Sequence, residues 1–108
     1  MHITGQGAAR YLIENGTAVA ASAAFQVSEL YRTFQARGET SSGAGAATIL
    51  VQGSIDGVNW ILLGTISLTL GTVTTSDGLA TSAMWPFVRG NITAISGTDA
   101  SVDLLMGV

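Results

Sequence analysis

Turn-forming dipeptides divide this sequence into short segments rich in β-branched and aromatic residues. Asn15-Gly16, Asp56-Gly57 and Asp77-Gly78 are three of them, and such pairs tolerate the positive φ that tight hairpin turns require. With the other glycine-containing stretches, turn signals recur about every 8–12 residues. This spacing predicts an all-β fold, an antiparallel β-sandwich or jelly-roll-like domain of roughly seven to nine short strands.

Residues 8–108 are expected to form this single β-sandwich domain, because 108 residues suit one core. Met1–Gly7 has two glycines and no periodicity and is interpreted as a flexible N-terminal arm. Asn15-Gly16 predicts a hairpin, with Thr17–Ala24 as its returning strand or, because it is rich in alanine, a helical turn. Thr40–Ala46 is expected to be a loop by its composition.

Phe25–Glu39 allows two interpretations. Leu30, Phe34 and Arg37 follow a helical spacing, but residues 30–37 also alternate, and Gly38 ends the run. We therefore favour a strand.

Three other segments are predicted strands. Ala47–Gln52 is almost continuously apolar, which indicates burial on both faces. Ile66–Leu70 alternates strictly, as half-buried strands do. Trp85–Ile95 is the longest expected strand, with Pro86 at its start because proline cannot donate to a ladder. One of its faces would carry four residues, Val88, Gly90, Ile92 and Ala94.

Three turns are expected to close hairpins or bends. At Asp56-Gly57, the Ser54 hydroxyl and the Asp56 carboxylate can cap backbone amides, and Trp60 would lie across the hairpin. Asp77-Gly78 predicts another turn. Ser96–Asp99 is expected to return the chain into Ala100–Met106 as an antiparallel hairpin.

Composition points to surfaces that face other protein. Gly, Ala, Ser and Thr occupy 52 of 108 positions (14, 15, 10 and 13), and charged residues are only 10%. A monomer so poor in charge has few devices against self-association, so we expect a homo-oligomer. The net charge of −3, with four arginines and no lysine, argues against nucleic-acid partners and anionic membranes. No apolar run approaches the ~20 residues of a membrane span.

Catalytic groups are scarce in this sequence. His2 is the only histidine and lies in the expected arm, and there is no cysteine, so a positioned base for a serine nucleophile is missing. Asp56, Asp77 and Asp99 each stand near a glycine, which suits turn formation better than paired acid chemistry. We expect no enzymatic activity.

A bound ion or cofactor is also not expected. Asp77, Asp99 and Asp103 could supply oxygens to calcium if their loops met at one end of a sandwich. Nothing resembles an EF-hand loop or a phosphate-binding loop, so we predict no cofactor and no metal.

Five residues are the candidates for interaction or structural roles: Asp56, Gly57, Trp60, Trp85 and Arg89. Exposed tryptophans on a sandwich can stack sugars, but core or subunit-interface anchoring is the interpretation we favour for Trp60 and Trp85. Arg89 would be a partly buried interface arginine paired with an aspartate.

Residues 48–108 resemble small virion structural proteins of tailed bacteriophages. The matching features are GSIDGVNW, the LGTISLT and WPFVRGNITAI strands, and SGTDASVDLLMG near the end. The resemblance implies a capsid decoration (cement) protein, with a tail or head–tail component as the alternative. It implies virion localisation after assembly in the host cytoplasm, the major capsid protein or other virion proteins as partners, and a trimer as the favoured oligomer.

The SxDGxxW element by itself is also similar to a hairpin of discoidin-type sugar-binding domains. A carbohydrate-binding β-sandwich module is therefore the alternative from another functional class.

Overall fold

The structure is a computed structural model that describes residues 9–22, 24–26, 32–81 and 85–107. Every regular element in these ranges is a strand. The nine strands are β1 Ala9–Gly16, β2 Ala20–Ala21, β3 Phe25–Gln26, β4 Arg32–Glu39, β5 Ser42–Ser54, β6 Ile61–Leu70, β7 Thr75–Thr81, β8 Phe87–Thr98 and β9 Ser101–Gly107.

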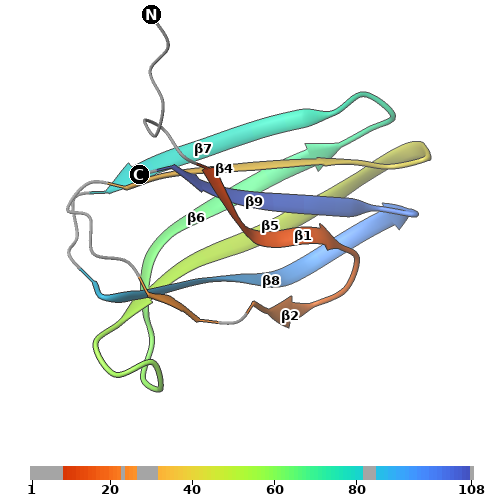
Figure 1. Cartoon of the computed structure of the whole chain (residues 1–108). Coiled ribbons are helices and arrows are strands. Elements are labelled where there is room, and N and C mark those ends of the chain that lie inside the picture. Colours follow the sequence, from red (N-terminus) through yellow and green to blue (C-terminus); the bar gives the residue numbers. More distant parts are fainter. Residues whose placement is uncertain (1–8, 23, 27–31, 82–84, 108) are drawn as a thin grey trace, which may run out of the picture.

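The strands form two antiparallel sheets that pack face to face as a β-sandwich (Figure 1). One sheet has four strands in the order β1-β9-β4-β7. The other has the order β2-β8-β5-β6, with β3 also pairing with β8. The predicted all-β sandwich is therefore confirmed, with a strand number at the top of the expected range.

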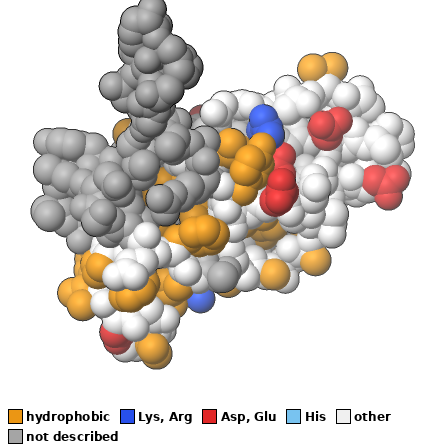
Figure 2. All heavy atoms as spheres, viewed as in Figure 1, with side chains coloured by type: hydrophobic (Ala, Val, Ile, Leu, Met, Phe, Trp, Pro, Cys, Tyr) orange, Lys and Arg blue, Asp and Glu red, His pale blue; other side chains and the backbone are white. Residues whose placement is uncertain are grey.

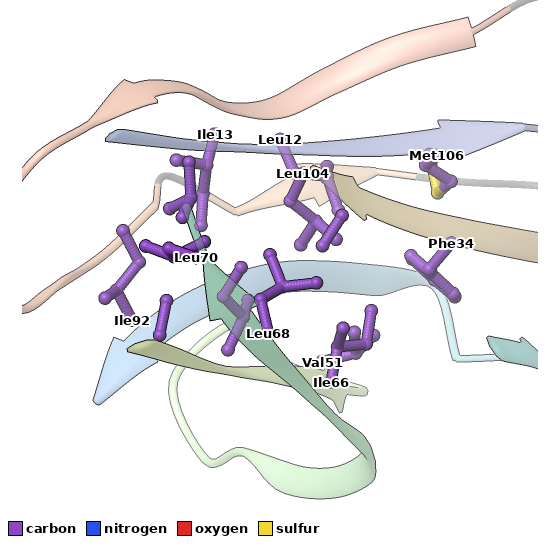
Figure 3. Packing of buried hydrophobic residues seen from close by; sticks show 14 of the residues in the cluster. Leu12, Ile13, Phe34, Val51, Ile66, Leu68, Leu70, Ile92, Leu104 and Met106 are labelled. Atoms are coloured by element: carbon purple, nitrogen blue, oxygen red, sulfur yellow. The ribbon is translucent and has the colours of Figure 1, made fainter. Parts of the chain in front are cut away.

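The core lies between the sheets, and among the described residues it is built of apolar side chains, most of them from alternate strand positions. Figure 3 shows Leu12, Leu104 and Met106 from the four-stranded sheet pointing toward Val51 and Ile66 of the other sheet. Because side chains alternate across a strand, each sheet turns one face inward and keeps its small polar residues outside. A glycine- and threonine-rich chain can thus build a dry core from few large residues.

Several strand predictions are confirmed. Phe34 and Ala36 are buried at alternate positions of β4, which is the strand pattern and not the helical one. Within β6, Ile66, Leu68 and Leu70 are buried and alternate with exposed residues. Pro86 directly precedes β8, where its missing N–H costs no ladder bond.

The burial of β5 differs from the expectation. Ala47, Ile49 and Val51 are buried, whereas the residues between them are only half-buried, so one face of the strand and not both is sealed in the core. The strand also begins at Ser42, so most of the expected loop Thr40–Ala46 is strand. Small side chains suit this segment because a Cβ at Gly45 would meet the carbonyl oxygen of Ser96 on β8.

The hairpin predicted at Asn15-Gly16 is wrong. β1 pairs with β9, and the next strand, β2, pairs with β8 in the other sheet. Asn15 has a positive φ of 53°, but Gly16 is needed for close packing, because a Cβ there would clash with Ile92 and Ile13.

The turn predicted at Asp77-Gly78 is also wrong, because both residues lie inside β7. A Cβ on Gly78 would stand 2.6 Å from the Phe34 carbonyl oxygen. Gly78 therefore allows β7 to pack close to β4, and it does not form a turn.

The predicted hairpin of β8 with Ala100–Met106 does not form. Gly97 and Asp99 have positive φ and do turn the chain, but β9 enters the four-stranded sheet, where it pairs with β1 and β4. The turn carries the chain from one layer to the other.

The predicted faces of β8 hold only for its first half. Val88, Gly90 and Ile92 do share a face, which the structure turns inward, but Ala94 is exposed and Ile95 packs against the core instead. A register shift against β5 near Ile92 moves one residue out of the pairing, and a bulge of this kind reverses which residues face inward. The predicted arm, residues 1–7, lies outside the described residues.

Candidate interaction surface at the β5–β6 loop

The loop between β5 and β6 is held by a local hydrogen-bond network. The Ser54 hydroxyl is buried and accepts hydrogen bonds from the backbone N–H groups of Asp56 (3.2 Å) and Gly57 (2.9 Å). It also donates to the Asp56 carboxylate at 2.8 Å. Gly57 supplies the positive φ of 75° that the turn needs. The capping roles predicted for Ser54 and Asp56 are thus confirmed.

The Asp56 carboxylate organises the second half of the loop. Its Oδ1 accepts the N–H groups of Val58 and Asn59, both at 2.9 Å, and its Oδ2 accepts the Asn59 side-chain amide at 2.8 Å. The backbone N–H groups of Asn59 and then Val58 lower the pKa of Asp56 well below its ordinary value, with further help from the Ser54 hydroxyl and the Asn59 amide. The ionised carboxylate is therefore a structural group of the turn.

This fixed loop holds apolar side chains out in solvent. Ile55 is 71% exposed and Val58 75% exposed; we call these two residues the apolar tip. Two more exposed hydrophobic residues, Ile61 and Leu62, follow at the start of β6. Figure 2 shows hydrophobic side chains at the lower end of the molecule, where Figure 1 places the β5–β6 loop. A rigid loop with exposed apolar residues is suited to docking.

Trp60 and Arg89 lie together at the base of the loop. The guanidinium carbon of Arg89 is 4.4 Å from the centroid of the Trp60 ring, and Arg89 Nε donates to the Gln52 Oε1 at 2.8 Å. Arg89 thus hydrogen-bonds to Gln52 and stacks on Trp60, so within the described part of this chain its partners are these two residues and not an aspartate. The arginine–aspartate pair of the described residues is Arg37–Asp103, at 3.1 Å.

Trp85 has a different place, over the end of β5. A Cβ on Gly53 would come within 2.9 Å of the Trp85 Cβ and Cγ atoms, so the glycine makes room for this ring. Of the five predicted candidates, Asp56 and Gly57 lie in the loop and Trp60 and Arg89 lie at its base. Trp85 lies over the end of β5, the strand that leads into the loop. Sequence reasoning missed the apolar tip, although two apolar residues beside an Asp-Gly turn were a visible signal.

A second polar group occupies the outer face of the four-stranded sheet. Arg37 bridges Tyr11 Oη at 2.6 Å and the Asp103 carboxylate, which also accepts the Asn15 N–H at 2.8 Å. The hydrogen bond to Asp103 is the main cause that raises the pKa of Arg37. Asn15, Arg37 and Asp103 line a surface hollow of about 230 Å³, and their polar groups are hydrogen-bonded to one another or to Tyr11.

The acids considered for calcium are engaged separately. Asp77 accepts the Gly78 N–H, Asp99 accepts the Ser41 hydroxyl, and Asp103 binds Arg37. Within the described ranges no three acids or histidines come together as a possible metal site. Among those same residues there is no helix long and apolar enough to cross a membrane.

No protein-family model and no curated protein matches this sequence. The fold, however, resembles a known structure. It is similar to the exported protein XepA of PBSX, with a TM-score of 0.61 over 94% of this chain. The chain spans only 37% of the length of XepA, and 13% of the aligned residues are identical. At that identity, the likeness to XepA establishes the shared fold.

Proposed function

We propose that this chain is a non-enzymatic structural protein of a phage-type particle, a capsid decoration protein that docks through its apolar tip. The observation that carries the proposal is the preorganised β5–β6 loop, which holds Ile55 and Val58 in solvent. A structural relative, XepA, is an exported protein of PBSX, a phage-like element. The phage resemblance of residues 48–108 points in the same direction.

The tip can bind without a large ordering cost. Immobilising a side chain or loop on association costs about 0.5–1.5 kcal/mol per rotamer-rich side chain, and the Ser54–Asp56 network has already fixed this loop in the free protein. Burying the Ile55 and Val58 side chains in a partner contributes roughly 1.5–3 kcal/mol each. Binding only to the assembled shell would stabilise that state by mass action, by about 2.7 kcal/mol at a hundredfold excess over Kd.

The particle role is tested by copy number and by a tip variant. Quantitative mass spectrometry of purified particles should find the chain in numbers comparable to the capsid hexamers. A number matching a tail ring or tube would replace the decoration role with a tail role, and absence from particles would overturn both.

Removing the tip should release the chain from particles. Ile55→Ser combined with Val58→Ser should weaken binding to particles by at least about a hundredfold, since two buried side chains are lost. Val19→Ser is the matched control, because Val19 is equally exposed, at 62%, but lies outside the loop. Equal binding of both variants would contradict docking through the tip.

The carbohydrate-binding alternative places sugar on Trp60 or Trp85. One face of the Trp60 ring is already covered by the Arg89 guanidinium, so a glycan on Trp60 must use the other face or displace the arginine. Titration with a broad glycan panel should leave the tryptophan fluorescence unchanged. A saturable change that Trp60→Ala abolishes would favour this alternative over the particle role.

A further inference from the structure

Sheet edges expose unpaired backbone groups, and most edges of this sandwich are protected. β2 and β3 have two residues each, and β1 is broken by two register shifts against β9. On β7, the Asp77 carboxylate accepts the N–H of Gly78 at 2.8 Å, and Asp77 shares a strand face with Leu79, which packs against the core. Short strands, bulges and charged side chains on the edge are among the devices that block edge pairing.

β6 is the exception among the described edge strands. It runs ten residues, Ile61–Leu70, pairs only with β5, and contains no charge and no proline. From Gly64 to Leu70 its register with β5 is regular. Its outer face carries the exposed residues Thr65, Ser67 and Thr69, while Ile66, Leu68 and Leu70 are buried.

We infer that β6 pairs antiparallel with β6 of a second copy, around a two-fold axis at Ser67. In that register Ser67 faces its own copy and Thr65 faces Thr69, so buried positions stay opposite buried positions. Hydroxyl side chains form favourable cross-strand pairs. In a chain of net charge −3, this uncharged strand brings no like charges together, and the contact is the same from both sides.

Exposed apolar residues lie at both ends of β6 and support a second copy of this chain as its pairing partner. Ile61 precedes Ser67 by six residues, and Val73, which is 79% exposed, follows it by six. The two-fold axis places the Ile61 end of one β6 alongside the Leu70 end of the other, where residues 71–73 leave the strand. A bulge in β6 opposite Val51 and Gln52 shifts this meeting by one residue. The apolar tip lies outside the regular part of β6, Gly64–Leu70, and is left free for the proposed docking.

Cysteine cross-linking tests the register directly, since the chain has no cysteine of its own. Facing residues of antiparallel strands have Cα atoms about 4.5–5.5 Å apart, within the range for a disulfide. Ser67→Cys should form a disulfide dimer on mild oxidation. Thr65→Cys should do so efficiently only when mixed with Thr69→Cys. Cross-linking of Thr65→Cys with itself, or none at Ser67→Cys, would overturn the register.

Light scattering with size-exclusion chromatography tests the dimer itself. The purified chain should have twice its 11.0 kDa mass, and Ser67→Lys should return it to the monomer, because like charges would face each other. Ala46→Lys is the control: Ala46 is exposed on β5 and pairs with Thr69 and Ser96, away from the edge. Circular dichroism checks that both variants are folded.

The outcomes separate this inference from the proposed function. A monomeric wild type, a trimer, or a dimer that Ser67→Lys leaves intact would overturn the β6 pairing. None of these results bears on whether Ile55 and Val58 dock on particles. Conversely, a tip variant that no longer binds particles should keep the mass of the dimer.

Discussion

At the scale of single residues, Ser54 and Asp56 decide the shape of the candidate interaction surface. Ser54 is fully buried, and its one hydroxyl serves two amides and a carboxylate. A buried polar atom with every bond satisfied is stable, whereas its removal leaves amides without partners. The geometry of the apolar tip therefore depends on a buried hydroxyl.

Ser54→Ala should lower the free energy of unfolding by about 1–3 kcal/mol, the usual cost of unsatisfied buried donors. Urea denaturation followed by tryptophan fluorescence measures this change. Ser76→Ala, on the exposed surface of β7, should change stability by less than about 0.5 kcal/mol. A Ser54→Ala protein as stable as the wild type would show that water replaces the hydroxyl.

The Asp56 carboxylate makes part of this stability dependent on pH. Its pKa in the folded chain lies below the ordinary value of 3.8, so ionisation favours the folded loop. The contribution is complete above the ordinary pKa and is lost as the pH falls through the lower folded value. The stability difference between wild type and Asp56→Asn should be constant from about pH 7 to 5 and shrink below about pH 4. A difference that grows in acid would contradict the assigned hydrogen bonds.

At the scale of elements, the strands at the sheet edges differ in how they resist further pairing. β7 carries the exposed Asp77, whose carboxylate accepts the N–H of Gly78. β6 has no such residue, although Leu79 of β7 lies over its Gly64 and closes the core between them. On this side of the sandwich, the edge strand β7 is protected against further strand pairing, whereas the neighbouring edge strand β6 is not.

Asp77→Val should remove the block on β7. The amide of Gly78 would lose its carboxylate partner, and a β-branched apolar residue favours pairing with another strand. Light scattering over a concentration series should show association beyond that of the wild type. Ser76→Val, which leaves Asp77 in place, is the control and should behave like the wild type. Unchanged scattering of Asp77→Val would mean that the edge is protected in another way.

At the scale of the whole molecule, stability rests on one apolar layer between the two sheets. Figure 3 shows side chains of β1, β9 and β4 meeting those of β5, β6 and β8. Leu104 and Phe34 are among the largest of these residues and are buried almost completely. With few large apolar residues available, each of them carries a substantial part of the core.

Leu104→Ala should cost about 2–5 kcal/mol, the sum of lost apolar burial and the cavity left behind. The denaturation midpoint should fall while the dependence on urea stays the same, since the surface exposed on unfolding hardly changes. Val19→Ala, at an exposed position, should stay within about 0.5 kcal/mol of the wild type. A small loss at Leu104 would indicate that the sheets close over the cavity.

The sequence alone determined the fold class, several strands and the local design of one loop. Alternation in Ile66–Leu70, Pro86 before β8 and the Ser54–Asp56 pair are all local features, because strand burial and turn capping are set by neighbours in the chain. The Asp56-Gly57 turn signal placed Trp60 beside Asp56 and Gly57, whereas the position of Arg89 next to Trp60 came only from the structure. The apolar tip was missed, although Ile55 and Val58 beside the Asp56-Gly57 turn are visible in the sequence.

Only the tertiary structure decided which strands pair and whether a glycine forms a turn or allows close packing. Asn15-Gly16 and Asp77-Gly78 have the sequence of hairpin turns, yet Gly16 and Gly78 are required by close contacts with Ile92 and with the Phe34 carbonyl. A glycine can either form a turn or allow another segment to pack closely against it. Which of these applies depends on a residue far away in the sequence. The exposure of Ala94 and the partner of Arg89 likewise follow from pairing with β5, a long-range contact that no local pattern records.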